Sequence, residues 1–519
     1  MRSSSTTKGQ DEGCFGISMT AKTLMIQGTS SSAGKSLLVA ALCRIYARRG
    51  IRVAPFKAQN MSNNAAVCAD GSEIGRAQAL QAAAAGLAPS VDMNPVLIKP
   101  EADSRSQIIL MGHPWQTLEA RTYYEKKNIL WEHVAQSLDR LRAVYDLVII
   151  EGAGSPAELN LRAGDIVNMA VARYAQSPVL LVGDIDRGGI FAQLLGTLWL
   201  LEPAERALVR GFVVNKFRGD LSLFDDGIRI LEKKGEIPVL GVIPYLRGLS
   251  LSDEDAVSVE VALLSSKPAS VGQTDIAVLA LPRIANFDDF DSLLAEPDVH
   301  IRHIDSASQL GKPHAVIIPG TKSTMADLDW LRQTGLADSI IDYAGNGGAV
   351  IGICGGYQML GEFIYDSRHV ESMVDRVPGL GLLPIVTQFL KNKSTFQVQA
   401  QIHFKNGWMS LLDDSIVSGY EIHMGETQTQ SSWLEITHRN GGQVKVPDGS
   451  VSSDGKIWGC YLHGIFANDS FRHVWLESLG WQGEVASQST RFEESLEKLA
   501  DAVENALDMD LLEKIIWDN

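Results

Sequence analysis

The sequence predicts an α/β protein with two parallel-sheet domains, and three patterns lead to that prediction. Short apolar runs without polar alternation recur between helical stretches, which is typical of central strands covered on both faces. Two series of such runs are separated by residues 246–274, where the periodicity is lost. Each series also contains a glycine-rich turn directly after an apolar run. Open α/β sheets bind their ligands at that edge.

Composition places the chain among ordinary globular proteins and excludes several classes. Apolar residues make up 45% and charged residues 21% of the 519 residues, enough for roughly two to four domains. The net charge of −16 argues against a nucleic-acid partner, which needs a basic face. No apolar stretch approaches the ~18 residues of a membrane span, so no membrane partner is expected. Five cysteines without paired spacing predict neither disulfides nor a zinc site, and a reducing, cytoplasmic location is expected.

The first series of apolar runs predicts an N-terminal domain over residues 22–245. Residues 1–21 are rich in Ser, Thr and Gly and lack the apolar centre of a signal peptide, so a disordered tail is expected. A helix is expected over residues 37–48, where apolar residues recur at helical spacing. The expected strands are residues 24–26, 53–56, 147–150, 179–182, 212–214 and 239–243.

The second series predicts a C-terminal domain over residues 275–519. A linker is expected at residues 246–274, which carry an acidic run at 253–255 and the small polar stretch SSKPASVGQT. An amphipathic helix is expected over residues 491–507, at the end of this domain. The expected strands are residues 276–281, 316–318, 350–353, 395–405 and 457–462.

The glycine-rich turn of the first domain has the composition of a phosphate-binding loop. Its sequence is Gly28-Thr29-Ser-Ser-Ser-Ala-Gly34-Lys35-Ser36, between a strand and a helix. The glycines let backbone N–H groups face phosphate, Lys35 suits terminal phosphates, and the Ser36 hydroxyl suits Mg²⁺. We therefore expect ATP at Gly28, Thr29, Gly34, Lys35 and Ser36. The alternative is a Ser/Gly-rich turn that binds nothing.

Acidic and basic residues at nearby strand ends are candidates to complete the nucleotide site. Mg²⁺ prefers oxygen ligands, and Glu151 stands at the end of an apolar strand, followed by Gly-Ala-Gly. Asp70 is a second candidate carboxylate, so the expected metal ligands are Ser36, Asp70 and Glu151. The alternative for either acid is a helix cap or turn acid. Lys57, at the end of strand 53–56, could steady a transferring phosphoryl group.

The glycine-rich turn of the second domain has the form of a nucleophile elbow. Gly352-Ile-Cys354-Gly355-Gly follows an apolar strand, a turn that lifts the cysteine above the sheet and offers the next N–H to an oxyanion. A thiolate paired with a base attacks carbonyl groups readily. Among eleven histidines, His463 is the best candidate base because it follows strand 457–462. A buried, inert cysteine and a structural histidine are the alternatives.

Both turns resemble those of known families. The phosphate loop is one residue longer than G-x4-G-K-[ST] and resembles the loops of dethiobiotin synthetase and of the amidating enzymes of corrin biosynthesis. The elbow and distant histidine resemble class I glutamine amidotransferase domains, in which cysteine forms a glutamyl thioester and releases ammonia. Cys354-Gly355-Gly-Tyr-Gln358 matches their C-x-G-x-Q pattern, which implies that Gly355 and Gln358 contact glutamine.

One departure from that pattern concerns the group that orients the histidine. Class I domains commonly follow the histidine with Pro-Glu, whereas Gly464-Ile465 stand here. The cobyric/cobyrinic branch shares this lack, and the orienting residue stays unassigned. Glu421 and His423 are candidates by residue type only.

Longer motifs extend the resemblance to most of the chain. They are FKAQNMSNN at 56–64, NPVLIKP at 94–100, GGIF at 188–191 and NKFRG at 215–219. With these motifs the chain from about residue 23 resembles the cobyric acid synthases of adenosylcobalamin biosynthesis. The resemblance implies ATP-dependent amidation of an acidic corrinoid, adenosylcobyrinic acid a,c-diamide, at side chains b, d, e and g, with glutamine as nitrogen donor. It also implies that Asn215 lies near the nucleotide base and that the segment 99–107 faces the substrate. A homo-oligomer is an open alternative to a monomer.

Three rival functions stay open at this point. A cobyrinic acid a,c-diamide synthase would use the same chemistry on other carboxylates, and FKAQNMSNN argues against it. A partitioning ATPase of the ParA/MinD type would have the phosphate loop but no use for an elbow. A non-catalytic paralogue would not need Lys35, Ser36, Glu151, Cys354 and His463 together.

Overall fold

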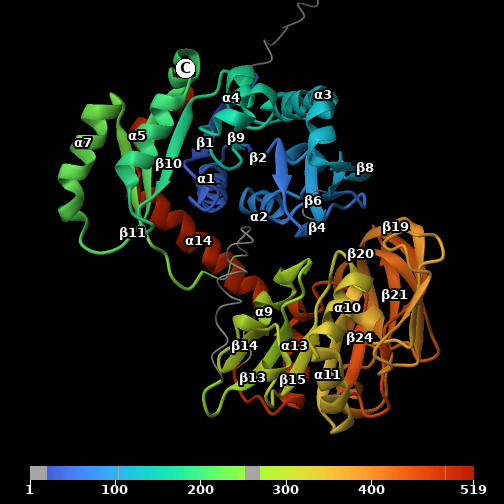
Figure 1. The fold of residues 1–519 in the computed structure, drawn as a ribbon. Helices are drawn as coiled ribbons and strands as arrows, with labels where there is room; N and C mark the ends of the chain where they lie inside the picture. The colour runs from blue at the N-terminus through green and yellow to red at the C-terminus, as the bar shows by residue number, and fades with distance from the viewer. Residues whose placement is uncertain (1–19, 103–104, 250, 252–268, 485–486, 519) are drawn as a thin grey trace, which may run out of the picture.

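The computed structural model describes residues 20–102, 105–249, 251, 269–484 and 487–518 (Figure 1). These residues form two α/β halves, blue to green and yellow to red in Figure 1. Nearly all of the predicted tail and most of the predicted linker lie outside the described residues.

The first half is built on a parallel sheet, whose order in the described chain is β12-β11-β10-β1-β9-β2. Its central strands are continuous apolar runs because helices cover both faces, and every residue of β9 is buried. This confirms the predicted sheet. The strands are β1 (Lys22–Gly28), β2 (Val53–Phe56), β9 (Leu147–Glu151), β10 (Val179–Asp184), β11 (Val209–Phe217) and β12 (Val239–Pro244).

Helices of the first half follow the strands, as the alternating pattern predicts. Helix α1 begins at Lys35, directly after the glycine-rich turn, and its face of Leu38, Leu42 and Ile45 is buried. The α-helices are α1 (Lys35–Arg48), α2 (Arg76–Ala84), α3 (Ala120–Val144), α4 (Met169–Ala175), α5 (Ile190–Leu200), α6 (Pro203–Arg206) and α7 (Asp225–Gly235). The 3₁₀ turns are η1 (Val91–Met93), η2 (Leu159–Gly164) and η3 (Leu221–Phe224).

A small mixed sheet follows β2 in the chain and lies between the two halves. Its order is β3-β6-β7-β8, and a separate hairpin pairs β4 with β5. Because side chains alternate along a strand, its two faces meet different surroundings. Ile98 and Ile108 face a large cavity, whereas Leu97 and Ile109 pack against the second half. These strands are β3 (Gln59–Met61), β4 (Ala65–Val67), β5 (Glu73–Gly75), β6 (Val96–Ala102), β7 (Arg105–Leu110) and β8 (His113–Glu119).

The second half also contains a mainly parallel sheet, ordered β14-β13-β15-β16-β24-β23, with only β23 antiparallel within the described residues. Its strands are β13 (Thr274–Leu279), β14 (Val299–Ile304), β15 (Ala315–Ile318), β16 (Ala349–Ile353), β23 (Ser450–Val451) and β24 (Ile457–Cys460). The helices and turns around it are η4 (Phe287–Phe290), α9 (Asp291–Leu294), η5 (Ala307–Gln309), α10 (Thr324–Gln333), α11 (Leu336–Gly345), α12 (Gly355–Met359), η6 (Gly407–Leu412), η7 (Ile465–Ala467) and α13 (Asp469–Ser478).

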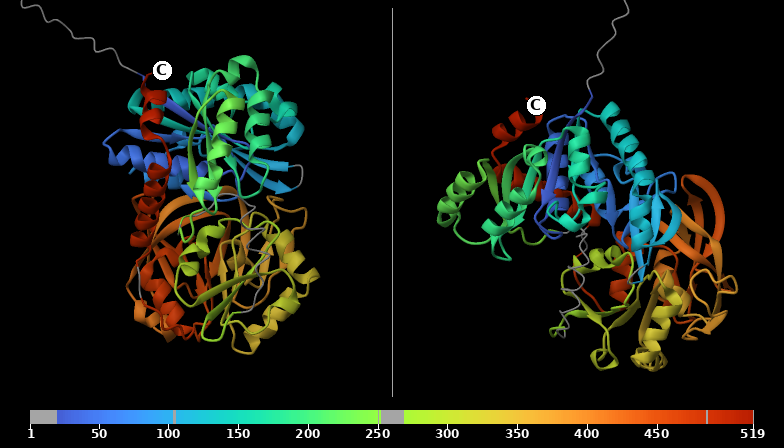
Figure 2. Two further views of the ribbon diagram at one scale, coloured as in Figure 1. Left: turned by 90° about the vertical axis from the view of Figure 1, so that its left-hand side faces the viewer. Right: turned by 45° about the horizontal axis from the view of Figure 1, so that its top comes forward.

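A further sheet flanks this one and reaches the first half. Its long strand β19 pairs with β20, and Gln397 of β19 donates a hydrogen bond to the Val67 carbonyl at 2.7 Å. The right-hand view of Figure 2 shows these orange strands beside the blue small sheet. The strands are β17 (Phe363–Tyr365), β18 (Arg376–Pro378), β19 (Ile385–Ile402), β20 (Ile416–Thr429), β21 (Leu434–Arg439) and β22 (Gly442–Asp448).

The chain ends on the first half, which corrects the predicted domain boundary. Helix α14 (Gln488–Ala506) was expected to close the second domain, but it packs on α1, and α15 (Met509–Trp517) follows it there (Figures 1 and 2). The physical reason is its apolar face, on which Leu496, Leu499 and Val503 join the core beneath α1. Arginines 44, 48 and 49 of α1 and its C-cap pair with acids of α14 and α15. No helix among the described residues is long and apolar enough to cross a membrane.

Candidate active sites

The phosphate loop follows the central strand β1 and wraps around its own lysine. Lys35 Nζ donates to the carbonyls of Ser30 at 2.8 Å, Ser31 at 3.1 Å and Gly154 at 3.3 Å. A Cβ on Gly28 would lie 2.9 Å from Lys35 Nζ, so only glycine lets the loop close around the lysine. The loop and α1 therefore present a buried cation at the start of a helix, an arrangement that binds anionic phosphate.

Glu151 lies at the centre of a buried polar cluster beside this loop. Its Oε1 accepts from Ser36 Oγ and from Lys57 Nζ, each at 2.8 Å, and its Oε2 accepts from Gln81 Nε2 at 2.6 Å. Burial alone would raise the pKa of Glu151, but Lys57 and the hydrogen bonds lower it below its usual value. Glu151 is therefore a charged carboxylate in direct contact with Ser36 and Lys57. Its expected role as a metal ligand stays a prediction.

The chemistry of these donors fits a magnesium ion. Ser36 Oγ and the Glu151 carboxylate are oxygen ligands in direct contact, the type that Mg²⁺ prefers. Gln81 was not predicted from the sequence, although it is completely buried here and donates to Glu151. Its Oε1 atom is buried without a hydrogen-bond partner, an oxygen that a cation or its water would satisfy.

The structure corrects the placement of Asp70. Its Oδ1 accepts from Ser72 N at 3.0 Å and from Ser72 Oγ at 2.5 Å, which closes the turn between β4 and β5. Glu151 is not among its contacts in the described chain. The physical reason is the short hairpin, in which an aspartate before Gly-Ser caps the turn with its own carboxylate.

Asn215 and Thr29 hold the outer side of the loop. Asn215 Nδ2 donates to the Ala33 carbonyl at 2.9 Å, and Thr29 Oγ1 donates to Gln193 at 3.1 Å. Gly34 has φ +93°, and a Cβ there would lie 2.2 Å from Asn215 Nδ2. Asn215 thus supports the loop backbone, and its expected contact with a nucleotide base stays a prediction.

A large cavity opens directly beside the phosphate loop. Its volume is about 1150 Å³, and the loop residues Thr29, Ser30 and Ser31 form part of its wall. Apolar side chains from β6, β7, β8 and α3 line another part, and cationic groups stand at its rim. These apolar and cationic residues are Ile98, Ile108, Leu118 and Tyr123, together with Lys127, Arg162 and Arg173.

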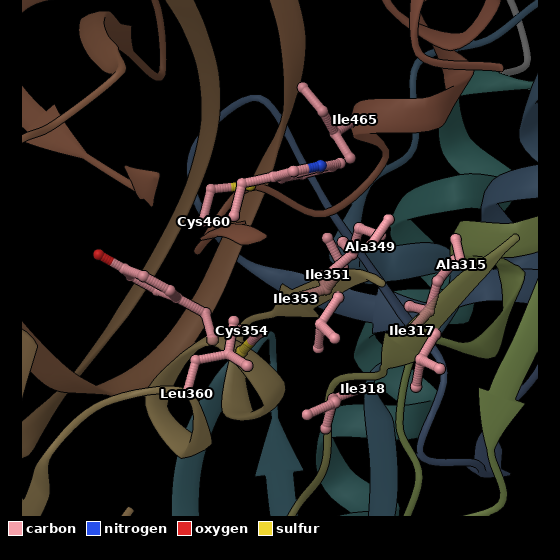
Figure 3. Close-up of a cluster of buried hydrophobic side chains, with 14 of the residues drawn as sticks. Ala315, Ile317, Ile318, Ala349, Ile351, Ile353, Cys354, Leu360, Cys460 and Ile465 are labelled. Atoms are coloured by element: carbon pink, nitrogen blue, oxygen red, sulfur yellow. The ribbon is translucent and has the colours of Figure 1, made fainter. Parts of the chain in front are cut away.

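Cys354 occupies the turn that the sequence predicted as a nucleophile elbow. Its backbone has φ +52° and ψ −108°, a region rarely adopted by non-glycine residues, and α12 begins at the next residue. The side chain emerges above the aliphatic residues of β15 and β16 (Figure 3). Neighbouring glycines permit the tight turn, because a Cβ on Gly356 would lie 1.9 Å from the Ile318 carbonyl.

His463 shares a cavity with Cys354, and its ring is contacted at both nitrogens. Nδ1 lies 2.8 Å from Asp289 Oδ2, and Nε2 lies 3.2 Å from Asn286 Nδ2. Burial lowers the pKa of His463, but the Asp289 carboxylate and the Cys354 sulfur raise it more, to about 10. A proton that moves from Cys354 to His463 is therefore held strongly. This is the behaviour of a general base oriented by an acid.

Asp289 is the orienting residue that the sequence left unassigned. The two candidates chosen by residue type face each other instead, since His423 Nε2 lies 3.3 Å from Glu421 Oε1 and Glu421 also pairs with Arg439. Asp289 lies on η4, 174 positions before His463, so no local motif joins them. In the sequence, the only indication of this orienting residue was the acidic run that follows an Asn in the loop after β13.

The cavity around Cys354 is small, about 70 Å³, and residues of both halves line it. Gln358 lies in its wall, where it accepts from Thr324 Oγ1 at 2.9 Å and donates to Tyr461 Oη at 3.1 Å. Glu371 is also in the wall, and burial raises its pKa to about 7. The first half contributes Asn63 and Lys99.

The described residues of the segment 99–107 line two cavities, and residues 103–104 lie outside the described chain. The expectation from resemblance that this segment faces the substrate stays a prediction. Pro100 and Ser106 line the large cavity, whereas Lys99 turns to the Cys354 cavity and pairs with Glu73 at 2.5 Å. Gln107 accepts from Lys322 of the second half at 2.9 Å. Burial lowers the pKa of Lys99 to about 7, although Glu73 opposes that change. The segment alternates because β6 and β7 separate the two cavities.

Comparisons with known proteins agree with this arrangement of two sites. The CobQ/CobB/MinD/ParA nucleotide-binding domain matches residues 24–259, and the CobB/CobQ-like glutamine amidotransferase domain matches residues 275–471. The second match ends before α14, in line with the corrected boundary. The elbow and the second domain match set the chain apart from ATPases that only partition or regulate.

Curated relatives match along almost the whole chain. The cobyric acid synthase of Chloroflexus aggregans is 55% identical over 500 residues, which cover 96% of this chain and 99% of the relative. Those of Chloroflexus aurantiacus and Herpetosiphon aurantiacus are each 53% identical, over 96% of this chain and 100% and 99% of the relatives. With its nucleotide-binding half and its amidotransferase half, this chain is a glutamine-hydrolysing, amide-forming enzyme and belongs to the cobyric acid synthase family.

Proposed function

We propose that this enzyme uses ATP, Mg²⁺ and glutamine to amidate side chains b, d, e and g of adenosylcobyrinic acid a,c-diamide, giving adenosylcobyric acid. The observation that carries the proposal is the cavity of about 1150 Å³ whose wall includes the phosphate loop. Sites for ordinary small ligands measure about 300–1,000 Å³, so this cavity has room for a ligand of macrocycle size.

The lining of the large cavity combines apolar side chains with cations and with four acids, Glu158, Asp165, Glu202 and Glu205. Ile98, Ile108 and Leu118 offer an apolar surface for the ring, and Lys127 and Arg173 offer cations for peripheral carboxylates. A carboxylate that enters near Ser30 and Ser31 would meet the terminal phosphate of a bound ATP.

Residues of the phosphate loop then supply the first half of the chemistry. The carboxylate oxygen attacks the terminal phosphorus of ATP, and ADP leaves, which produces an acyl phosphate that ammonia can attack. Lys35 moves from its loop carbonyls to phosphate oxygens, and Lys57 adds a second cation beside Glu151. Ser36 and Glu151 would hold Mg²⁺, which neutralises phosphate charge when bound.

The Cys354 cavity supplies the ammonia. Cys354 gives its proton to His463 and attacks the glutamine side-chain carbonyl, and the N–H of Gly355, the residue after the nucleophile, would stabilise the oxyanion. His463 returns the proton to the leaving nitrogen, which departs as ammonia, and water then hydrolyses the thioester to glutamate. Glu371 and Lys322, in the same wall, suit the ammonium and carboxylate groups of glutamine.

A panel of corrins tests the proposed substrate. The enzyme is given cobyrinic acid, its a,c-diamide and more fully amidated corrins, each with ATP, Mg²⁺ and either glutamine or ammonium. We expect the adenosylated a,c-diamide to gain amides at b, d, e and g, counted by mass spectrometry and located by NMR. Turnover of cobyrinic acid that stops at the a,c-diamide would instead identify the rival diamide synthase.

A further inference from the structure

A short loop, residues 286–289, touches the catalytic histidine with two of its side chains. Asp289 Oδ2 lies 2.8 Å from His463 Nδ1, and its Oδ1 accepts from Gly464 N at 2.8 Å. Asn286 Nδ2 lies 3.2 Å from His463 Nε2. The orientation of the His463 ring therefore depends on where this loop is held.

The same loop is held from the other side by the nucleotide-binding half. Ala65 N donates to Asn286 Oδ1 at 3.2 Å, and Asn64 Oδ1 accepts from the loop backbone at 3.3 Å. Arg76 Nε forms an ion pair with Asp288 Oδ2 at 2.9 Å. Among these contacts only the Arg76 pair joins opposite charges, and such bonds are stronger than bonds between neutral groups.

Two adjacent acids of the loop have different partners, and Arg76 is the partner of one of them. Asp288 and Asp289 are adjacent and both buried, yet Asp289 faces His463 while Asp288 faces Arg76. The Asp288 side chain is only 4% exposed, so without Arg76 its charge would be buried without compensation. Asp288 would then take up a proton or turn toward His463, and either change disturbs Asp289.

Arg76 is presented by a helix whose other end is also fixed. It is the first residue of α2, and Gln81, about 7.5 Å further along the helix, donates to Glu151 at 2.6 Å. Gln78 between them accepts from Asn60 at 3.0 Å. The position of the guanidinium is thus set by the nucleotide site rather than by a surface loop.

We propose that Arg76 is a positioning residue for glutamine hydrolysis: from the nucleotide-binding half it holds Asp288, and through the 286–289 loop it keeps Asp289 and Asn286 on His463. The glutamine site is then complete only when α2 is docked against the second half. This rests on the proposed function and deepens it, by making release of ammonia depend on the synthetase half.

The location of Arg76 predicts which kinetic constant changes. Arg76 lines a separate groove between the two halves, of about 680 Å³, and among the described residues the Cys354 cavity is lined by others. Its loss should therefore lower kcat for glutamine hydrolysis and leave the KM for glutamine near that of the parent. The groups that face His463 and set its titration are Asp289 and Asp288 of the loop, Cys354 of the elbow and Tyr420 of β20.

The test compares Arg76→Met, which keeps the apolar stem, with Arg76→Lys, which keeps the charge. For Arg76→Met we expect kcat of glutaminase to fall about tenfold to a hundredfold. We also expect the alkaline limb of its pH profile to move to lower pH, since a displaced Asp289 raises the pKa of His463 less. Arg76→Lys should recover most of the parental kcat and most of the parental pH profile. Asp288→Asn should also lower kcat for glutamine hydrolysis. The double variant with Arg76→Met and Asp288→Asn should have a kcat only slightly below that of Arg76→Met alone.

Two further measurements separate a positioning role for Arg76 from a general loss of folding. Ammonium-dependent synthesis reports on folding and on the phosphate loop, and Arg140→Met removes a more exposed ion pair, with Asp92, elsewhere on the same half. If Arg76→Met kept the parental rate and pH profile, or lost rate without a shift and without rescue by lysine, Arg76 would not position His463. Glutaminase is measured without any corrin, so failure of the proposed substrate would leave this test intact.

Discussion

The two cavities of the enzyme differ in how far they are assembled before any substrate binds. Around Cys354 the cavity is about 70 Å³, both halves line it, and both nitrogens of His463 are contacted. Beside the phosphate loop the cavity is about 1150 Å³, and Lys35 donates hydrogen bonds to backbone carbonyls around the loop itself. The glutamine site is therefore small and joined by hydrogen bonds, whereas the phosphate site is spacious.

This difference matches the two substrates. Glutamine is small and reacts at one carbonyl, so a tight cavity can hold its nucleophile, base and oxyanion donor in one geometry. A corrinoid that must present several carboxylates in turn to one phosphate loop needs room to bind in more than one orientation. Arg76 and the helix that carries it join the two halves; substitutions of residues that serve one cavity alone should accordingly spare the other.

The largest expected effect is at the glutamine cavity. Cys354→Ala should abolish glutamine-dependent synthesis, because the thioester cannot form without sulfur, and should leave ammonium-dependent synthesis near the parental rate. The measurement is amide formation with each nitrogen source. Cys460, which is buried beside the elbow but not in the cavity wall, provides the matched control as Cys460→Ala. Loss of both activities in a folded Cys354→Ala protein would contradict two separate sites.

The opposite pattern, loss of synthesis with partial survival of glutaminase, is expected from a substitution in the phosphate loop. Lys35→Ala should stop synthesis with either nitrogen source, since the transferring phosphoryl group loses a buried cation. Basal glutaminase should survive in part because Lys35 is outside the Cys354 cavity. Lys234→Ala, an exposed lysine of α7, is the control for loss of a positive charge. Parental ammonium-dependent synthesis by Lys35→Ala would remove the lysine from the site.

An intermediate effect is expected at Asp289. Asp289→Asn keeps the size but removes the charge that raises the pKa of His463 to about 10. Glutaminase should fall on the order of 10²- to 10⁴-fold, the range known for loss of an orienting acid. Because the pKa of His463 then falls, the imidazolium loses its proton at lower pH and the alkaline limb moves down from about pH 10.

The control for Asp289 is the pair that the sequence suggested first. Glu421→Gln removes the acid that faces His423 and Arg439, so its effect on the pH profile should be small. Equal alkaline shifts in the two variants would mean that Asp289 is not the specific partner of His463. The measurement is kcat for glutamine hydrolysis between neutral and alkaline pH, with circular dichroism to confirm folding.

Sequence patterns were sufficient to predict the features that depend on residues close together in the chain. The strands β1, β9 and β10 contain the short apolar runs 24–26, 147–150 and 179–182. The two glycine-rich turns stand directly after strands, so chain order alone places Lys35 and Cys354 at sheet edges. The longer motifs, which resemble those of a known family, also predicted the family.

Features that depend on distant packing could not be predicted in this way. Asp289 reaches His463 across 174 positions, and Gln81 reaches Glu151 across 70. Helix α14 has the same amphipathic pattern whichever domain it covers, because periodicity shows that a face is buried but not what buries it. Asp70 had the residue type of a ligand, but its short hairpin directs its carboxylate to Ser72.

The smallest expected effect is on the Mg²⁺ requirement, and it distinguishes Glu151 from Asp70 as a metal ligand of the phosphate site. Glu151→Gln should raise the Mg²⁺ concentration needed for ammonium-dependent synthesis by at least about tenfold, because Ser36 then lacks its carboxylate partner. The variant also removes the charge of the carboxylate that pairs with the buried Lys57, which should cost about 3 kcal/mol of stability, so thermal unfolding is measured in parallel. Asp70→Asn is the matched control, and its Mg²⁺ titration should superimpose on that of the parent. Glutaminase should be spared in Asp70→Asn, since Asp70 does not line the Cys354 cavity. A parental titration for Glu151→Gln, or a shifted one for Asp70→Asn, would reverse the assignment of the two carboxylates.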